Sequence, residues 1–294
     1  MSWTNVVEWL KDNQAFFNPP ICNKQMHDDG VLSVFFVGGP NQREDYHVER
    51  GEELFYQLKG DMILKVREQN RFKDIHIREG EIFLLPGKIP HSPQRFSDTI
   101  GLVIERRRLK DVEYDCLRYY VKPGEDPEVL FERWFHVTAL GTQLVSVINE
   151  FMESEERKTG IPGRKSRLCE PYFEDDTSFQ LDTPKSIAKF ISDNARILGA
   201  PGGNVLVYPT SKYKFHVEVL GDGSHCREAP KNGEAFLYQL SGNGLCEHSI
   251  GENMMSQQST LLLQAASFCK ITNEPCARTL FVLVNMPETV LFPA

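Results

Sequence analysis

The sequence predicts a mainly β protein made of two similar β-domains with a few peripheral helices, and three observations support this fold class. A segment at residues 51–60, GEELFYQLKG, returns 182 residues later as GEAFLYQLSG at residues 233–242. Short β-rich runs recur at intervals of roughly 8 to 12 residues, separated by glycine, proline and charged turns. Helical periodicity is confined to short stretches near the start and in the middle of the chain. The pattern favours two sandwiches or barrels over alternating β–α units.

The first half of the chain is expected to begin with a short helix and to continue as strands. Val6 and Leu10 fit one face of this helix, and Asn13 stands where it would end. β-rich runs follow at residues 31–37, 54–58, 62–66, 75–77, 82–85 and 100–105. Apolar residues then recur every three or four positions over residues 144–152, which predicts a second helix. We expect this domain to span residues 1–158.

The second half repeats the strand pattern after a linker. Residues 159–177 are polar and contain glycines and prolines, as expected of a connection between domains. Thr183 is predicted to cap a further helix whose first residue is Pro184. β-rich runs follow at residues 205–208, 215–219, 237–240, 260–263 and 280–284. The second domain is expected to cover residues 178–294.

Composition argues against several classes of protein. The 294 residues suffice for roughly two domains, and the net charge of −8 argues against a nucleic-acid partner. Glu8, Lys11 and Asp12 interrupt the N-terminal region, so we expect no signal peptide, and no apolar run approaches the ~18 residues that span a bilayer. The seven cysteines include no Cys-x-x-Cys pair, which disfavours a disulfide framework or a closed zinc site. We expect a cytosolic protein with no membrane or nucleic-acid partner.

Three residues of the first copy carry the donor atoms of a metal site. His47 precedes Glu53 by six residues, and His91 follows a proline-containing turn on what should be a neighbouring strand. Two imidazoles and one carboxylate are the ligand set of a mononuclear Fe(II) centre with one open face. Taken singly, each histidine is more often a loop or core residue. At a constant offset of 182 the second copy has other residues at these positions, and is expected to be degenerate and metal-free: Ala229, Ala235 and Asn273.

The spacing around these residues resembles the two sequence motifs of the cupin superfamily. Residues 47–60 contain His, Glu and Gly at the spacing of the first motif, with Glu49 where many cupins have a second histidine. Residues 80–91 resemble the second motif, with Lys88 and Arg95 in place of a usual Gly and Asn. The resemblance implies that each domain is a double-stranded β-helix, or jelly roll, and that the whole chain is a bicupin with the metal in the mouth of the first barrel.

A closer resemblance is to the 3-hydroxyanthranilate 3,4-dioxygenase family. It is dense from about residue 19 to 160 and is carried by residues 36–41, 43–47, 51–58, 80–86, 90–96, 101–110, 117–121, 129–135 and 141–144. That family opens the ring of 3-hydroxyanthranilate with non-haem iron and O₂, on the kynurenine route to quinolinate and NAD. The resemblance implies an oxidoreductase with one Fe(II) per chain, held by His47, Glu53 and His91, and with 3-hydroxyanthranilate and O₂ as its small-molecule partners.

The resemblance also implies roles for three charged residues. Arg95 would pair with the substrate carboxylate through its planar guanidinium. Glu53 would also contact the substrate, beside the metal. Glu105 would anchor the substrate hydroxyl or amino group and accept a proton, and Arg43 would stabilise bound dioxygen. The ordinary alternatives are a surface position for Arg95 and an ion pair with an arginine at 106–108 for Glu105. For Arg43 the alternative is a salt bridge to Glu44, Asp45 or Glu49.

Two other functions fit parts of the pattern. Cupin sites also support isomerases and other oxygenases, so the same ligands are compatible with a different reaction. The alternative from another class is a metal-free binding or storage bicupin, for which loss of His47 or Glu53 would leave iron content and function unchanged. In either case the second copy is expected to cover the open face of the first domain, as a partner subunit would, and we therefore expect a monomer.

Overall fold

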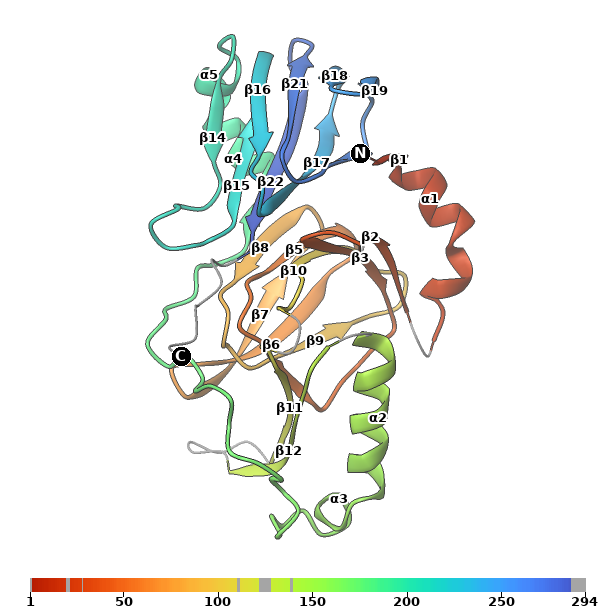
Figure 1. Ribbon diagram of the computed structural model, residues 1–294, viewed down its shortest axis with the longest axis vertical. Helices are drawn as coiled ribbons and strands as arrows, with labels where there is room; N and C mark the ends of the chain where they lie inside the picture. Colours follow the sequence, from red (N-terminus) through yellow and green to blue (C-terminus); the bar gives the residue numbers. More distant parts are fainter. Residues whose placement is uncertain are drawn as a thin grey trace.

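The computed structural model describes residues 2–19, 22–27, 29–109, 112–121, 128–137 and 140–286. Its strands form four antiparallel sheets, two in each of two stacked β-domains (Figure 1). The domain drawn in orange to green carries the first motif pair, and the domain drawn in cyan to blue carries the repeat. The predicted bicupin architecture is confirmed. No helix among the described residues is long and apolar enough to cross a membrane.

The first barrel is formed by two six-stranded sheets. One sheet has the order β13-β8-β5-β10-β3-β2, with β2 Asn23–His27, β3 Leu32–Gly38, β5 Glu53–Lys59, β8 Glu81–Leu85, β10 Ile100–Arg106 and β13 Lys185–Ser186. The other has the order β12-β11-β4-β9-β6-β7, with β4 Tyr46–Val48, β6 Met62–Glu68, β7 Arg71–Ile77, β9 His91–Arg95, β11 Asp115–Tyr120 and β12 Val129–Phe135. The short strands β4 and β9 place the predicted histidines side by side.

The second barrel repeats this plan with a six-stranded and a four-stranded sheet. The larger sheet, β1-β20-β17-β22-β15-β14, contains β1 Ser2–Asn5, β14 Asn204–Leu206, β15 His216–Leu220, β17 Gly233–Ser241, β20 Ser259–Leu263 and β22 Arg278–Asn285. The smaller sheet, β16-β21-β18-β19, contains β16 Gly223–Ala229, β18 Gly244–His248, β19 Gly251–Met255 and β21 Ser267–Asn273.

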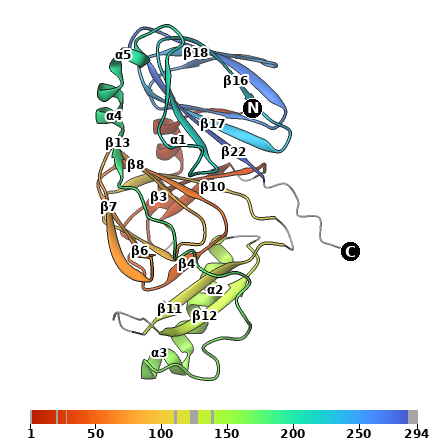
Figure 2. The same ribbon diagram turned by 90° about the vertical axis from the view of Figure 1, so that its left-hand side faces the viewer.

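The helices lie at the periphery, as Figures 1 and 2 show. They are α1 Val6–Asp12, the 3₁₀ helix η1 Gln14–Phe17, α2 Leu140–Glu153, α3 Glu155–Thr159, α4 Ile187–Asp193 and α5 Ala195–Leu198. The two helices predicted near residues 6–13 and 144–152 are confirmed. In α2, Val147 and Phe151 pack against Leu117, Tyr119 and Phe131 of the β11–β12 hairpin, which fixes the helix against the first barrel.

The predicted start of the third helix at Thr183 and Pro184 is wrong. Lys185 and Ser186 instead form strand β13, which pairs with Ile82 and Glu81 of β8. Helix α4 begins at Ile187, and the Ser186 side chain caps it by accepting a hydrogen bond from the Lys189 N–H. Pairing with a distant strand keeps the chain extended after Pro184, and local sequence signals do not report such pairing.

The two domains share one apolar core where the sheet of the first barrel that contains β5 faces the six-stranded sheet of the second. Alternate residues along each strand point to opposite sides of a sheet, so one set faces the other domain and the next set faces the inside of its own barrel. The shared core contains Val34, Leu54, Ile104, Val217, Phe236 and Val282. The interior of the first barrel contains the neighbouring set, including Phe55, Leu64, Phe83 and Val103. The face of β5 that carries Phe55 also carries Glu53.

Each domain completes its sheet with a strand from the other half of the chain. β1 pairs with β20 of the second barrel, with Thr4 opposite Thr260, and β13 pairs with β8 of the first barrel, with Lys185 opposite Ile82. A short helix follows each of these strands, α1 after β1 and α4 after β13. The repeat therefore includes an exchanged N-terminal strand and helix. The division of the chain at residues 158 and 178 stays a prediction.

The strand registers correct two of the equivalences drawn from a constant offset. Tyr56 pairs with Ile82 in the first copy and Tyr238 with Thr260 in the second, so the offset falls from 182 to 178 residues between these strands. In the first copy His91 lies opposite both Val66 of β6 and His47 of β4. In the second copy the residue at the register position of His91 is Cys269, and the residue at the position of His47 is Arg227. These two residues also lie opposite one another. The assignments of Asn273 and Ala229 are therefore wrong, whereas Ala235 does replace Glu53.

Candidate metal and substrate site

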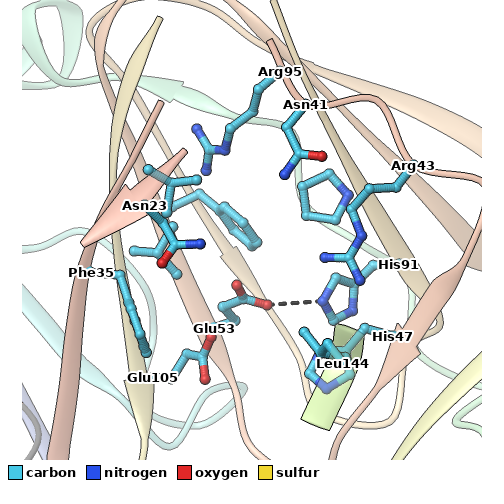
Figure 3. A pocket seen from close by; sticks show the side chains of 14 residues that line it. Asn23, Phe35, Asn41, Arg43, His47, Glu53, His91, Arg95, Glu105 and Leu144 are labelled. Carbon is cyan, nitrogen blue, oxygen red and sulfur yellow. Dashed lines mark ion pairs between the residues drawn. The ribbon is translucent and has the colours of Figure 1, made fainter. Parts of the chain in front are cut away.

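Three of the predicted residues meet on the inner wall of the first barrel. His47 of β4 lies directly opposite His91 of β9, and their ring centroids are 5.3 Å apart. Glu53, the first residue of β5, places Oε2 2.9 Å from Nε2 of His91 (Figure 3). All three side chains are buried. The fold thus brings His91 together with His47 and Glu53, which precede it by 44 and 38 residues.

Hydrogen bonds behind the two rings fix which nitrogen of each histidine is free to bind a metal. The Nδ1 atom of His91 lies 3.0 Å from the carbonyl oxygen of Ile89, which can only accept, so Nδ1 carries a hydrogen. The Nε2 atom of His47 lies 2.8 Å from a carboxylate oxygen of Asp115. A ring that donates one N–H to a carboxylate or carbonyl keeps a lone pair on its other nitrogen, as metal-bound histidines do. The nitrogen left with a lone pair is therefore Nε2 in His91, on the side of Glu53, and Nδ1 in His47.

The charges around these residues also fit a divalent cation. Oxygen atoms of Glu49, Glu53 and Glu105 all lie within 4.8 Å of one another, and carboxylates that close repel unless a cation or proton lies between them. Glu53 Oε2 and Glu49 Oε2 are buried and lie 2.9 Å from Nε2 of His91 and 2.8 Å from Nη2 of Arg108, respectively. Five carboxylates and three guanidinium groups surround the site: Asp45, Glu49, Glu53, Glu105 and Asp115 with Arg43, Arg95 and Arg108. Burial and the neighbouring carboxylates raise the pKa of both Glu49 and Glu105.

Arg108 links the carboxylates beneath the site. Its guanidinium makes ion pairs with Glu49 at 2.8 Å, with Asp115 at 2.8 Å and with Glu105. Burial alone would raise the pKa of Asp115, but Arg108 and the hydrogen bond from His47 lower it to about 2. Asp115 is therefore an ionised acceptor for the His47 N–H. The alternative considered for Glu105, an ion pair with an arginine at 106–108, is thus present, and Arg106 separately binds Glu113 at 2.6 Å.

Arg95 differs from the other arginines of the site because it is buried and forms no ion pair with any described residue. It lies on β9, four residues after His91 and on the same face of the strand. Its Nη1 atom is 3.2 Å from the amide oxygen of Gln57, and only 2% of the residue is exposed. Burial lowers the pKa of Arg95 to about 10, which leaves it charged at neutral pH. A buried charge without a counter-ion is costly, so this guanidinium is suited to an anionic ligand.

Glu105 and Arg43 line the same cavity and also form the ion pairs that were their alternatives. Glu105 is paired with Arg108, and burial raises the pKa of Glu105 despite this partner. Arg43 is held by Asp45 through Nε and Nη2. Both side chains nevertheless reach the cavity (Figure 3). The ion pairs fix the position of these side chains and leave them at the cavity wall.

The cavity has a volume of about 130 Å³ and is bordered by several residues that sequence reasoning missed. Asn23 of β2 and Phe35 of β3 lie on one side, Asn41 lies near Arg95 and Arg43, and Leu144 of α2 lies near the two histidines (Figure 3). Pro93 also lines the cavity. Asn41 and Leu144 fall in segments that resemble the dioxygenase family, which was a usable signal. Asn23 carries no local signal, because only the pairing of β2 with β3 brings it to the site.

The fold and the buried ligand set define a two-domain cupin with a candidate metal centre. Among solved structures, the chain resembles a salicylate 1,2-dioxygenase from Pseudoaminobacter salicylatoxidans, with a TM-score of 0.60 and 11% identity over 97% of this chain and 80% of that one. A cupin 2 conserved barrel domain protein from Leptotrichia buccalis covers 97% of this chain and 96% of its own, with a TM-score of 0.51 and 11% identity. At such identities the likeness shows the fold alone.

Sequence comparison identifies the family. The family model for 3-hydroxyanthranilic acid dioxygenase matches residues 1–152. The human 3-hydroxyanthranilate 3,4-dioxygenase is 44% identical over 262 residues, 89% of this chain and 89% of that protein. The protein of that name from Nematostella vectensis is 41% identical over 280 residues, 95% of this chain and 98% of its own. The chain belongs to the 3-hydroxyanthranilic acid dioxygenase family.

Proposed function

We propose that the chain is an Fe(II)-dependent, ring-opening dioxygenase that converts 3-hydroxyanthranilate and O₂ to 2-amino-3-carboxymuconate semialdehyde, in the kynurenine pathway to quinolinate and NAD. Membership of the family supports the reaction. The structural observation that carries the substrate assignment is Arg95, a buried guanidinium without an acidic partner among the described residues, on the same strand as His91. An aromatic acid with a carboxylate supplies the missing counter-ion.

In this proposal His47, Glu53 and His91 hold one Fe(II). Fe(II) held there would supply coordination positions for the hydroxyl and amino groups of the substrate and for O₂, and a route for electron density from the substrate to O₂. Asp115 and the Ile89 carbonyl each accept the N–H of one ring nitrogen, so the other nitrogen of each imidazole keeps the lone pair that ligation needs. Two histidines and one carboxylate would leave coordination positions that the protein does not fill.

The other residues bind and orient the substrate. Arg95 binds its carboxylate with two parallel N–H donors, which fixes the ring with its hydroxyl and amino groups toward Glu53. Glu105, whose pKa is raised by burial, accepts the proton of the hydroxyl group. Arg43, held by Asp45, supplies positive charge beside the position where dioxygen becomes reduced. Phe35 and Leu144 border the cavity and exclude water from it.

Anaerobic reconstitution tests this function. The apo protein is loaded with Fe(II) without oxygen, mixed with 3-hydroxyanthranilate, and then exposed to O₂ while the ultraviolet absorbance of the semialdehyde product is followed. We expect product only after O₂ is admitted, with one O₂ consumed per ring opened. Turnover in the absence of O₂ would instead indicate an isomerase, and full activity of His47→Ala or Glu53→Ala would contradict the metal assignment.

Two further parts of the proposal concern the molecule in the cell. We propose that it is a monomer in the cytosol, because the shared core between the two domains already covers the face that a partner subunit would cover. Light scattering of the purified protein that gave twice the mass of 33.7 kDa would contradict the monomer. Recovery of the native protein in a membrane or organelle fraction would contradict the location.

A further inference from the structure

The glutamates next to the repeated glycines, Glu52 and Glu234, make matching contacts across the domain interface. Glu52 reaches the second domain, where its two carboxylate oxygens accept the N–H groups of Lys214 and Phe215, each at 2.8 Å. Glu234 reaches the first domain, where Oε2 accepts the N–H groups of Val31 at 2.7 Å and Leu32 at 3.0 Å. Both glutamates are buried. We call each glutamate with its two amides a clasp.

The clasps are related by the approximate twofold symmetry of the repeat. Tyr56 and Tyr238, which occupy equal positions in the two copies, meet at the interface with ring centroids 6.0 Å apart. Each clasp ends where the chain enters the corresponding strand of the other domain, β3 in one case and β15 in the other. The two clasps differ in their neighbours. Glu52 precedes Glu53, whereas Glu234 precedes Ala235.

The first clasp restrains the residue from which Glu53 extends. Successive side chains of an extended chain point to opposite faces, so Glu52 faces the second domain while Glu53 faces the cavity. The pairing of β5 with its neighbours begins at Glu53, which leaves the preceding peptide without a strand partner. Charge-assisted hydrogen bonds to backbone amides are short and directional. Two of them hold the Glu52 side chain, and through it the backbone that sets the direction of the Glu53 side chain.

We propose that Glu52 is a positioning residue, through which the second domain holds the metal ligand Glu53 in place. The second copy thus serves the site without contributing a ligand to it. This inference rests on the assignment of Glu53 in the proposed function. It also accounts for the glutamate that follows the glycine in both copies. The interface needs each glutamate, whether the next residue is a metal ligand, as Glu53 is, or not, as in the case of Ala235.

The matched variants Glu52→Ala and Glu234→Ala, made in the full-length chain, test the proposal. Each removes one clasp and leaves two buried N–H groups without their acceptor, so both are expected to lower the Tm of the apo protein by similar amounts. Metal binding is measured by Co(II) titration of the apo protein, followed by the visible absorption of bound cobalt. We expect Glu52→Ala to weaken Co(II) binding by about 10- to 100-fold, as loss of residues that orient metal ligands does, and to change the cobalt spectrum. Glu234→Ala should bind Co(II) as the unaltered protein does.

Further variants decide the matter if Glu52→Ala does not fold. Glu52→Gln keeps one carbonyl acceptor and is expected to restore part of the Co(II) affinity. Lys214→Pro removes one donor of the clasp from the second domain, with Val31→Pro as its counterpart at Glu234, and only the former should weaken Co(II) binding. Equal Co(II) affinity in both members of each pair would overturn the proposal. A chain that binds Co(II) as expected but does not turn over 3-hydroxyanthranilate would contradict the proposed function and leave this inference standing.

Discussion

At the scale of single residues, the site depends on how each buried charge is balanced. Arg108 balances three carboxylates, and Arg43 is balanced by Asp45. Arg95 has only the neutral amide of Gln57 as its hydrogen-bond acceptor among the described residues. The first two arginines therefore maintain the structure of the site in the free protein, and the third is available to a ligand.

Replacing Arg95 by glutamine is expected to weaken the use of 3-hydroxyanthranilate specifically. Loss of hydrogen bonds to a charged group costs about 1.5–3 kcal/mol, so kcat/KM should fall about 10- to 100-fold, mainly through KM. The measurement is steady-state oxygen uptake. With 2-aminophenol, which lacks the carboxylate, the variant and the unaltered protein should react at similar rates. Equal losses with both compounds would show that Arg95 does not bind the carboxylate.

Replacing Arg108 by glutamine is expected to destabilise the protein. Removing one partner of a buried ion-pair network costs about 3–5 kcal/mol, because the remaining carboxylates keep their charge without compensation. Urea unfolding followed by fluorescence measures the loss. Arg157→Gln is the control, because the Arg157 side chain is 42% exposed and lies 3.6 Å from an exposed Glu44, and exposed pairs contribute about 0–1 kcal/mol. If Arg108→Gln lowered the free energy of unfolding no more than Arg157→Gln does, the ion-pair network would have no stabilising role.

At the scale of elements, α2 contributes to the cover of one side of the cavity. Leu144 lines it, and Phe151, two turns further along, is stacked on Tyr119 with ring centroids 3.5 Å apart. The helix is thus attached to the β11 strand at one end and exposes an apolar side chain to the cavity at the other. Its attachment determines how well Leu144 shields the site.

Phe151→Ala should loosen this cover. Truncating a buried phenylalanine costs about 3–5 kcal/mol, so we expect faster hydrogen exchange along α2 and a higher KM for the substrate, with metal binding unchanged. Met152→Ala is the neighbouring control, since Met152 is 55% exposed and surface substitutions change stability by about 0.5 kcal/mol or less. Unchanged exchange in α2 after Phe151→Ala would contradict the assigned role.

The elements also show what could be read from the sequence and what could not. The juxtaposition of His47, Glu53 and His91 was predictable because motif spacing fixes which strands they occupy. Asp115 was not, because it reaches His47 only through the pairing of β11 with β4, 68 residues away. The start of α4 was missed for the same reason, since the pairing of β13 with β8 outweighs the helix signal of Pro184.

At the scale of the whole molecule, the metal is expected to contribute to stability. A ligand that binds only the folded state stabilises it by about 2.7 kcal/mol at one hundred times its Kd. Removal of the metal by a chelator should therefore lower Tm by several degrees, and Fe(II) or Co(II) should restore it. His91→Ala should show no such difference between metal-loaded and chelated samples. An unchanged Tm after chelation of the unaltered protein would argue against a metal held by these residues.

Equivalent residues of the two copies could be matched from the sequence only where the copies align without insertions or deletions. GEELFYQLKG and GEAFLYQLSG aligned directly, and the replacement of Glu53 by Ala235 was predicted correctly. From Ile82 onward the sequence offset between the two copies is four residues smaller. The residues of the second copy that correspond to His47 and His91 could be identified only from the strand register. The residues of the second copy at the positions of His47 and His91 are Arg227 and Cys269, and neither is a histidine.

The exchanged strand β1 has a consequence for the order in which the chain folds during synthesis. Thr4 and its partner Thr260 are 256 residues apart. At roughly 5–20 residues per second, β1 leaves the ribosome on the order of ten seconds to a minute before β20 exists to receive it. Strand β1 is therefore paired only late in synthesis. During that interval β1 is an open edge to which neighbouring nascent chains can add, and the first barrel must mature without it.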